Sequence, residues 1–147
     1  MGFKQVLEKK QFIFGFLLPI LIGGLIYVFF RSNTLIMFSW FNDLRISPII
    51  LDIRQYTMPF KNYFPDWFLY SLPDGLWIFS YTSLILLLSN NIIKFKNIFW
   101  ILIIFIYVIS IEFLQLFGLY NGTFDIFDIL FYISGVSMPF IFYANQK

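Results

Sequence analysis

Five polar residues interrupt the apolar second half of the chain, and their side chains are the best suited to chemistry. Glu112 and Gln115 stand three residues apart, as do Asp125 and Asp128, while Asp74 stands earlier. Residues three apart share one face of a helix. Carboxylates and an amide on facing helices can hydrogen-bond a polar ligand or relay protons. Because an ionisable group at membrane depth costs about 2.5–3.5 kcal/mol, this pattern predicts a functional cluster.

The composition around these residues is that of an integral membrane protein. The 147 residues are 60% hydrophobic and 12% charged, and the mean hydropathy is +0.81. Cys and His are absent, which excludes thiolate and imidazole metal sites, disulfides, Cys nucleophiles and His acid–base catalysis. The net charge of +2 is too small to indicate nucleic-acid binding. We expect no cofactor and no resident metal.

Apolar runs of near-spanning length predict an all-α integral membrane protein with four transmembrane helices in a single domain, residues 1–147. Proline and glycine positions predict local features: a bend at Pro139, close helix packing at Gly135 and a tight turn on Asn121-Gly122. The predicted spans cover residues 12–30, 73–89, 98–117 and 125–143.

The long connection 31–71 predicts two short helices lying in the membrane interface. Asn33 is the expected cap of the first, and Ser47-Pro48 opens the second near Ile49–Tyr56. The apolar stripe of the first helix fits the interface, and Arg45 and Arg54 are expected to face lipid phosphates. That stripe consists of Met37, Trp40, Phe41 and Leu44.

After these helices, prolines are expected to keep the chain irregular up to Pro73. Ser71 and Asp74 have the spacing of a capping box for the second span. Trp77, just inside that span, is expected in the aromatic belt at the membrane surface.

The distribution of basic residues predicts that both termini lie in the cytoplasm. In that orientation Asp74, Glu112, Asp125 and Asp128 all lie in the outer leaflet. The residues expected on the inner side are Lys4, Lys9, Lys10, Lys94, Lys96 and Lys147.

Each polar residue also has a purely structural interpretation. Asp125 and Asp128 fit the N-cap and first turn of the last span, and Gln115 fits a hydrogen bond between helices. Glu112 lies well inside its helix, where it caps nothing. We expect a protonated Glu112, hydrogen-bonded to Gln115 or a backbone carbonyl, ahead of pairing with Arg45 or Arg54, with a bound Mg²⁺ or Ca²⁺ last.

The same residues resemble the VanZ-like family of small bacterial membrane proteins. The family pattern is E-x-x-Q, an Arg, D-x-x-D or D-x-D-D, then Asn and Gly. Glu112, Gln115, Asp125, Asp128 and Gly135 follow it in order. Asp74 after Pro73 resembles the family's P-x-D-K-x-x-H segment. This chain differs at the Arg, Asn, Lys and His places, which are Gly122, Tyr132, Gly75 and Ile78.

The resemblance implies a multi-pass protein of the bacterial inner membrane, linked to glycopeptide resistance or cell-envelope homeostasis. Our leading hypothesis is a protein that binds a lipid-linked or amphiphilic ligand in an outer-leaflet polar pocket. That pocket is expected to be floored by Glu112 and Gln115 and roofed by the 31–71 loop. The alternative is a small accessory subunit with partner membrane proteins. Enzyme or transporter activity is the least favoured, because no catalytic constellation is recognisable.

Overall fold

The protein is all-helical over residues 3–144, the part of the chain that the computed structural model describes. A π-helical segment joins the first two α-helices into one continuous helix. The elements in order are α1 (Phe3–Lys10), the π-helix η1 (Gln11–Leu17), α2 (Leu18–Phe30), α3 (Ile36–Asp43), α4 (Ser47–Thr57), the 3₁₀ helix η2 (Met58–Tyr63), α5 (Asp66–Leu88), α6 (Phe95–Leu116) and α7 (Ile126–Tyr143).

Four of these helices are long and apolar enough to cross a membrane. This confirms the predicted class, a helical protein with four candidate membrane spans. All four agree with the sequence-based bounds within one residue at their C-terminal ends. The four helices are Gln5–Phe30, Asp66–Leu88, Phe95–Leu116 and Ile126–Tyr143.

The second span begins earlier than the sequence predicts. α5 begins at Asp66 after Pro65, and Pro73 lies inside the helix. The expectation of an irregular chain up to Pro73, with a Ser71–Asp74 capping box, is therefore wrong. Proline removes one helical hydrogen bond, but membrane helices tolerate it where neighbouring groups satisfy the freed carbonyl. Both Ser71 and Asp74 are thus side chains of the helix interior, available to neighbouring helices.

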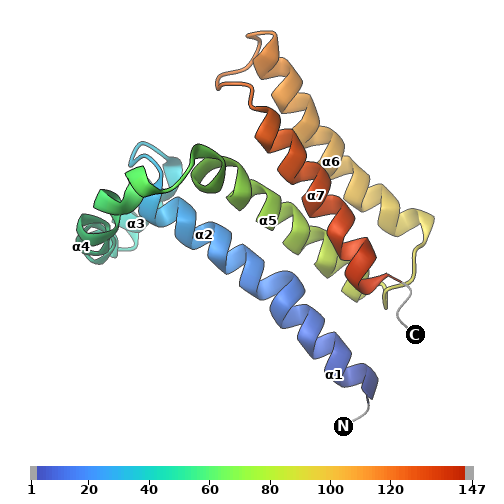
Figure 1. Ribbon diagram of the computed structural model, residues 1–147. Coiled ribbons are helices and arrows are strands. Elements are labelled where there is room, and N and C mark those ends of the chain that lie inside the picture. Colours follow the sequence, from blue (N-terminus) through green and yellow to red (C-terminus); the bar gives the residue numbers. More distant parts are fainter. Residues whose placement is uncertain (1–2, 145–147) are drawn as a thin grey trace.

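α5 is the centre of the molecule, with α2 on one side and α7 on the other (Figure 1). α5 and α7 cross most closely at Gly75 and Gly135, where a Cβ added to Gly135 would overlap the carbonyl oxygen of Gly75. This confirms the predicted close packing at Gly135. α6 contacts α5 and α7 far less than those two contact each other. It therefore forms the loosest part of the bundle.

The helices of the 31–71 connection dock on the end of α2 through Arg54. Its side chain is 4% exposed and donates hydrogen bonds to the carbonyl oxygens of Val28 and Arg31, the latter at 2.8 Å. The guanidinium also lies over the Phe38 ring, 4.9 Å from its centroid. Burial lowers the pKa of Arg54, but a guanidinium stays protonated in proteins. Arg54 thus satisfies carbonyls that the end of α2 leaves free.

The expectation that Arg54 faces lipid phosphates is therefore wrong. Its buried position depends on tertiary packing against α2, which the sequence does not reveal. Arg45 lies in the exposed turn between α3 and α4, where its φ is 58°. The expected Asn33 cap is also not formed, because α3 begins at Ile36 with Leu35 as its N-cap.

The opposite end of the bundle, which we call the basic end, carries Lys9, Lys10, Lys94 and Lys96. The start of α1 and the end of α7 both lie there (Figure 1). Gln11 and Asn91 form a reciprocal amide pair that ties η1 to the α5–α6 turn, with N–O distances of 2.9 and 2.8 Å. Gln11 Nε2 also donates to the Ser83 carbonyl at 3.1 Å.

Candidate functional site

The acidic cluster, defined as Asp74, Glu112, Asp125 and Asp128, begins where α6 meets the start of α7. Glu112 is 3% exposed, and its Oε2 accepts a hydrogen bond from the backbone N–H of Asp125 at 3.4 Å. Asp125 is the N-cap of α7, since its Oδ1 accepts from the Phe127 N–H at 2.8 Å. The predicted capping role of Asp125 is confirmed. Glu112, in turn, holds the cap residue of the neighbouring helix.

α5 adds a buried hydroxyl to this corner. Ser71 is fully buried, and neither its Oγ nor Asp128 Oδ1 has a hydrogen-bond partner within the described chain. The Ser71 and Glu112 side chains nevertheless lie beside the Asp128 carboxylate, close enough to influence it. Buried polar atoms are nearly always paired, so two neighbouring buried atoms without a hydrogen bond of good geometry mark an unusual site.

A short polar chain connects Asp74 to a cation on α2. The Tyr27 hydroxyl donates to Asp74 Oδ1 at 3.1 Å, and Arg31 donates to the Tyr27 oxygen at 3.0 Å. The Arg31 guanidinium is fixed between two rings, 4.6 Å from the Tyr27 centroid and 4.8 Å from that of Tyr70. Its charge acts on both Asp74 and Asp128. Arg31 is therefore the cation that balances part of the acidic cluster.

Two of the partners predicted for Glu112 do not bind it. Gln115 does not bond to it, because the Gln115 amide packs on Gly122 and donates to the Asn121 carbonyl at 3.5 Å. Arg54 does not pair with it, because Arg54 is committed to the carbonyls of α2. Among the described residues, no three acidic side chains are grouped so that they could hold a metal ion.

Of the predicted site residues, Asp74, Asp125 and Asp128 all lie within electrostatic range of Glu112, while Gln115 turns toward the α6–α7 connection. Residues that the sequence analysis did not assign to the site complete it: Tyr27, Ser71 and Tyr132. The Tyr132 hydroxyl lies within electrostatic range of Asp74, Glu112 and Asp128. One signal was available, because Tyr132 follows Asp128 by four residues and so lies on the same helix face.

A pocket of about 370 Å³ lies beside this cluster, in the loose space between α5, α6 and α7. Asp74 and Tyr132 lie together in its wall. The predicted floor and roof are not those observed, because Glu112 and Gln115 do not line it and the α3–α4 segment packs on α2 instead. The lining residues are Asp74, Trp77, Ile78 and Tyr81 from α5, Ile104 and Val108 from α6, and Tyr132 from α7.

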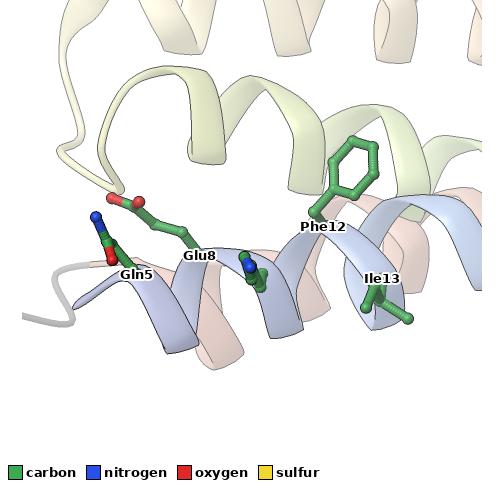
Figure 2. A pocket seen from close by; sticks show the side chains of 5 residues that line it. Gln5, Glu8, Phe12 and Ile13 are labelled. Carbon is green, nitrogen blue, oxygen red and sulfur yellow. The ribbon is translucent and has the colours of Figure 1, made fainter. Parts of the chain in front are cut away.

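A larger hollow of about 450 Å³ lies toward the basic end, but it is a different kind of feature. Residues of one continuous helix line it, and Figure 2 shows Glu8 beside Gln5, with Phe12 projecting further along that helix near Ile13. A recess on a single helix cannot surround a ligand. The pocket beside Asp74 has walls from three helices and is the better candidate site.

No protein-family model matches the chain, and neither a curated protein nor a solved structure matches it. The fold and the site therefore define the class by themselves. The chain is a multi-pass helical membrane protein with an acidic cluster at one end and a pocket between the middle parts of three helices.

Proposed function

We propose that this protein is a VanZ-like protein of the bacterial cell envelope that binds a lipid-linked or amphiphilic ligand at the outer leaflet. The observation that carries the proposal is the pocket between α5, α6 and α7. It combines a carboxylate and a phenol with the apolar side chains of Ile78, Ile104 and Val108. An amphiphile has the same division into a polar head and an apolar chain.

The size and position of the pocket support this ligand class. Small-molecule sites in proteins have volumes of about 300–1,000 Å³ and combine apolar walls with few polar groups. The pocket, at about 370 Å³, is large enough for a headgroup and the first part of a chain. α6 packs loosely against α5, so a ligand can enter sideways from the bilayer without passing through water.

The α3–α4 segment supports placement of the acidic cluster near headgroup height, with the pocket reaching from there to the middle of the spans. This segment docks on the end of α2 at Arg31, and together with η2 it exposes large apolar and aromatic side chains. Trp and Tyr prefer the membrane–water interface, so we assign α3 and α4 as interfacial helices. The exposed set includes Trp40, Leu44, Ile49, Tyr56 and Tyr63. The four carboxylates of the VanZ-like pattern meet at this same level, which favours the family assignment and an envelope role.

The test is native mass spectrometry of the protein released from bacterial membranes in a mild detergent. The pocket-filled variant carries Ile104→Phe and Val108→Phe, both in the pocket wall. The lipid-face variant carries Ile103→Phe and Ile106→Phe, whose side chains are 45% and 60% exposed on the same helix. We expect wild type and the lipid-face variant to retain one selective amphiphile, and the pocket-filled variant to lose it.

Two results would contradict the proposal. One is retention of bulk phospholipid in proportion to its abundance. The other is an equal loss of the ligand from both variants, since that would place the bound molecule outside the pocket.

A second candidate is an accessory subunit of a larger membrane complex. The outer face of α6 favours it, because that helix exposes a continuous apolar surface and packs least against the rest of the bundle. A partner recovered at constant stoichiometry, and lost in the lipid-face variant, would support this role.

A further inference from the structure

The wall of the pocket beside Asp74 combines three aromatic rings and one carboxylate with three aliphatic side chains. Trp77, Tyr81 and Tyr132 line it together with Asp74, and its lining includes no Lys or Arg. Rings around a carboxylate are the surroundings that an organic ammonium group prefers, because each ring face attracts a cation. The chemistry of the wall therefore favours a ligand whose headgroup is a cation.

The rings are held in place by contacts outside the pocket. Trp77 packs on Tyr27 with a centroid distance of 4.7 Å and lies against Gly23, where an added Cβ would come within 2.6 Å of its Nε1. The Tyr81 hydroxyl donates a hydrogen bond to the Trp100 carbonyl at 3.0 Å. Tyr132 is only 7% exposed. A ligand thus meets a preformed wall, which lowers the cost of ordering side chains on binding.

The charged groups closest to the pocket are carboxylates, and they also favour a cationic headgroup. Asp74 lines it, and Asp128 and Glu112 act on the Tyr132 hydroxyl from behind the wall. The Arg31 charge reaches Asp74 through Tyr27, on the α2 side. An anionic phosphate in this pocket would face carboxylates without a lining cation to pair with it. A cation would be attracted by Asp74 directly, and by Asp128 and Glu112 where these are ionised.

We propose that the pocket binds an organic ammonium group carried on an apolar chain. This inference rests on the proposed function, that the pocket takes an amphiphile, and specifies its head. The ammonium belongs either to a membrane lipid with an amine in its headgroup or to a free amphiphilic amine. In both cases the ammonium lies between Asp74 and the rings of Trp77, Tyr81 and Tyr132, and the chain follows Ile104 and Val108.

Equilibrium binding to the protein in phosphatidylglycerol nanodiscs tests this directly. The probes are decyltrimethylammonium and decanol, which share a chain and differ in the head. A desolvated cation–π contact contributes about 2 kcal/mol or more, so we expect at least about tenfold tighter saturable binding of the ammonium. Asp74→Asn should remove most of this preference. Asp66→Asn, which neutralises an exposed carboxylate on the same helix, should keep it.

A second variant keeps the inference testable if Asp74→Asn misfolds. Trp77→Leu removes one ring and should weaken binding of the ammonium while leaving decanol unchanged. Competition then shows which kind of molecule carries the ammonium group. Phosphatidylethanolamine added to the nanodiscs displaces the probe if the natural ligand is an amine-headed lipid, and leaves it bound if the ligand is a free amine.

Three results would overturn the inference. Equal binding of both probes, abolished in the pocket-filled variant, would mean an amphiphile pocket without preference for ammonium; the proposed function would survive. An unchanged preference in Asp74→Asn and Trp77→Leu would place the cation elsewhere. No saturable binding of either probe would remove both the inference and the proposed function.

Discussion

The two ends of α5 bury polar side chains in different ways. At the basic end, Gln11 and Asn91 are neutral amides that satisfy each other in both directions, and Gln11 has a further partner in the Ser83 carbonyl. At the acidic end, where the acidic cluster lies, Glu112 accepts one long backbone hydrogen bond. Asp128 Oδ1 and Ser71 Oγ form no hydrogen bond of good geometry within the described chain, although Ser71 and Glu112 lie beside the Asp128 carboxylate. Only the acidic end borders the three-helix pocket.

This difference separates a structural network from a functional one. A buried network in which every atom is paired holds helices together. Unpaired hydroxyls also occur at Thr82 and Ser83, but a carboxylate oxygen costs more to leave without a donor than a neutral hydroxyl does. Fold stability alone does not account for the carboxylates of the acidic end. Their position beside a pocket of complementary chemistry does.

The largest effect is expected from Gly135→Ala, because both ends depend on the crossing of α5 and α7. The added methyl group would overlap the Gly75 carbonyl, and backbone cannot move aside cheaply. Overpacking of this kind costs about 1–3 kcal/mol or more. Gly24→Ala is the matched control, since nothing lies within 4 Å of its added Cβ. Thermal melting in detergent should show a large decrease in melting temperature for Gly135→Ala and none for Gly24→Ala. Equal melting temperatures would refute the close crossing.

The next effect is expected from Gln11→Leu at the basic end. The substitution leaves the Asn91 amide without its partner in a part-buried place. Leaving a buried polar group unsatisfied costs about 1–3 kcal/mol. Gln5→Leu, at an exposed position on the same continuous helix, should change the melting temperature little. Similar melting temperatures for the two variants would mean that the amide pair is not structural.

The smallest effect is expected from Ser71→Ala at the acidic end. The hydroxyl is fully buried without a partner, so its removal leaves no group newly unpaired. We expect the free energy of unfolding to change by less than about 0.5 kcal/mol, in either direction. A loss above about 1 kcal/mol would show that the hydroxyl donates to Asp128 and that the acidic end is paired like the basic end.

The sequence was sufficient to predict the four long helices, because long apolar runs determine membrane spans directly. It also identified the close approach at Gly135 and the cap at Asp125, both of which depend on local residue type. The prediction that the second span begins at Pro73 was wrong. It relied on the preference of proline for the first turn of a helix. The tolerance of an internal proline depends on neighbouring helices that the sequence does not position.

The partners of the site residues were less accessible to prediction. Nothing in the sequence distinguishes Arg54, which is buried against carbonyls, from Arg31, which reaches the acidic cluster through Tyr27. Their roles follow from the way the α3–α4 segment folds back on α2. Tyr132 was noted as a departure from a family pattern, whereas its place in the pocket wall follows from the crossing angle and register of α7.

The central claim is that an amphiphile occupies the pocket between α5, α6 and α7, and Trp77 can report this occupancy. In a variant with Trp40, Trp67 and Trp100 replaced by Phe, Trp77 is the single tryptophan. We predict saturable quenching of its fluorescence by a decylammonium brominated along its chain, and loss of that saturable component in the pocket-filled variant. The companion variant with Trp100 alone reports the lipid face, where this side chain is 48% exposed. If quenching of Trp77 rises linearly and in parallel with that of Trp100, the pocket is empty of amphiphile and the account is wrong.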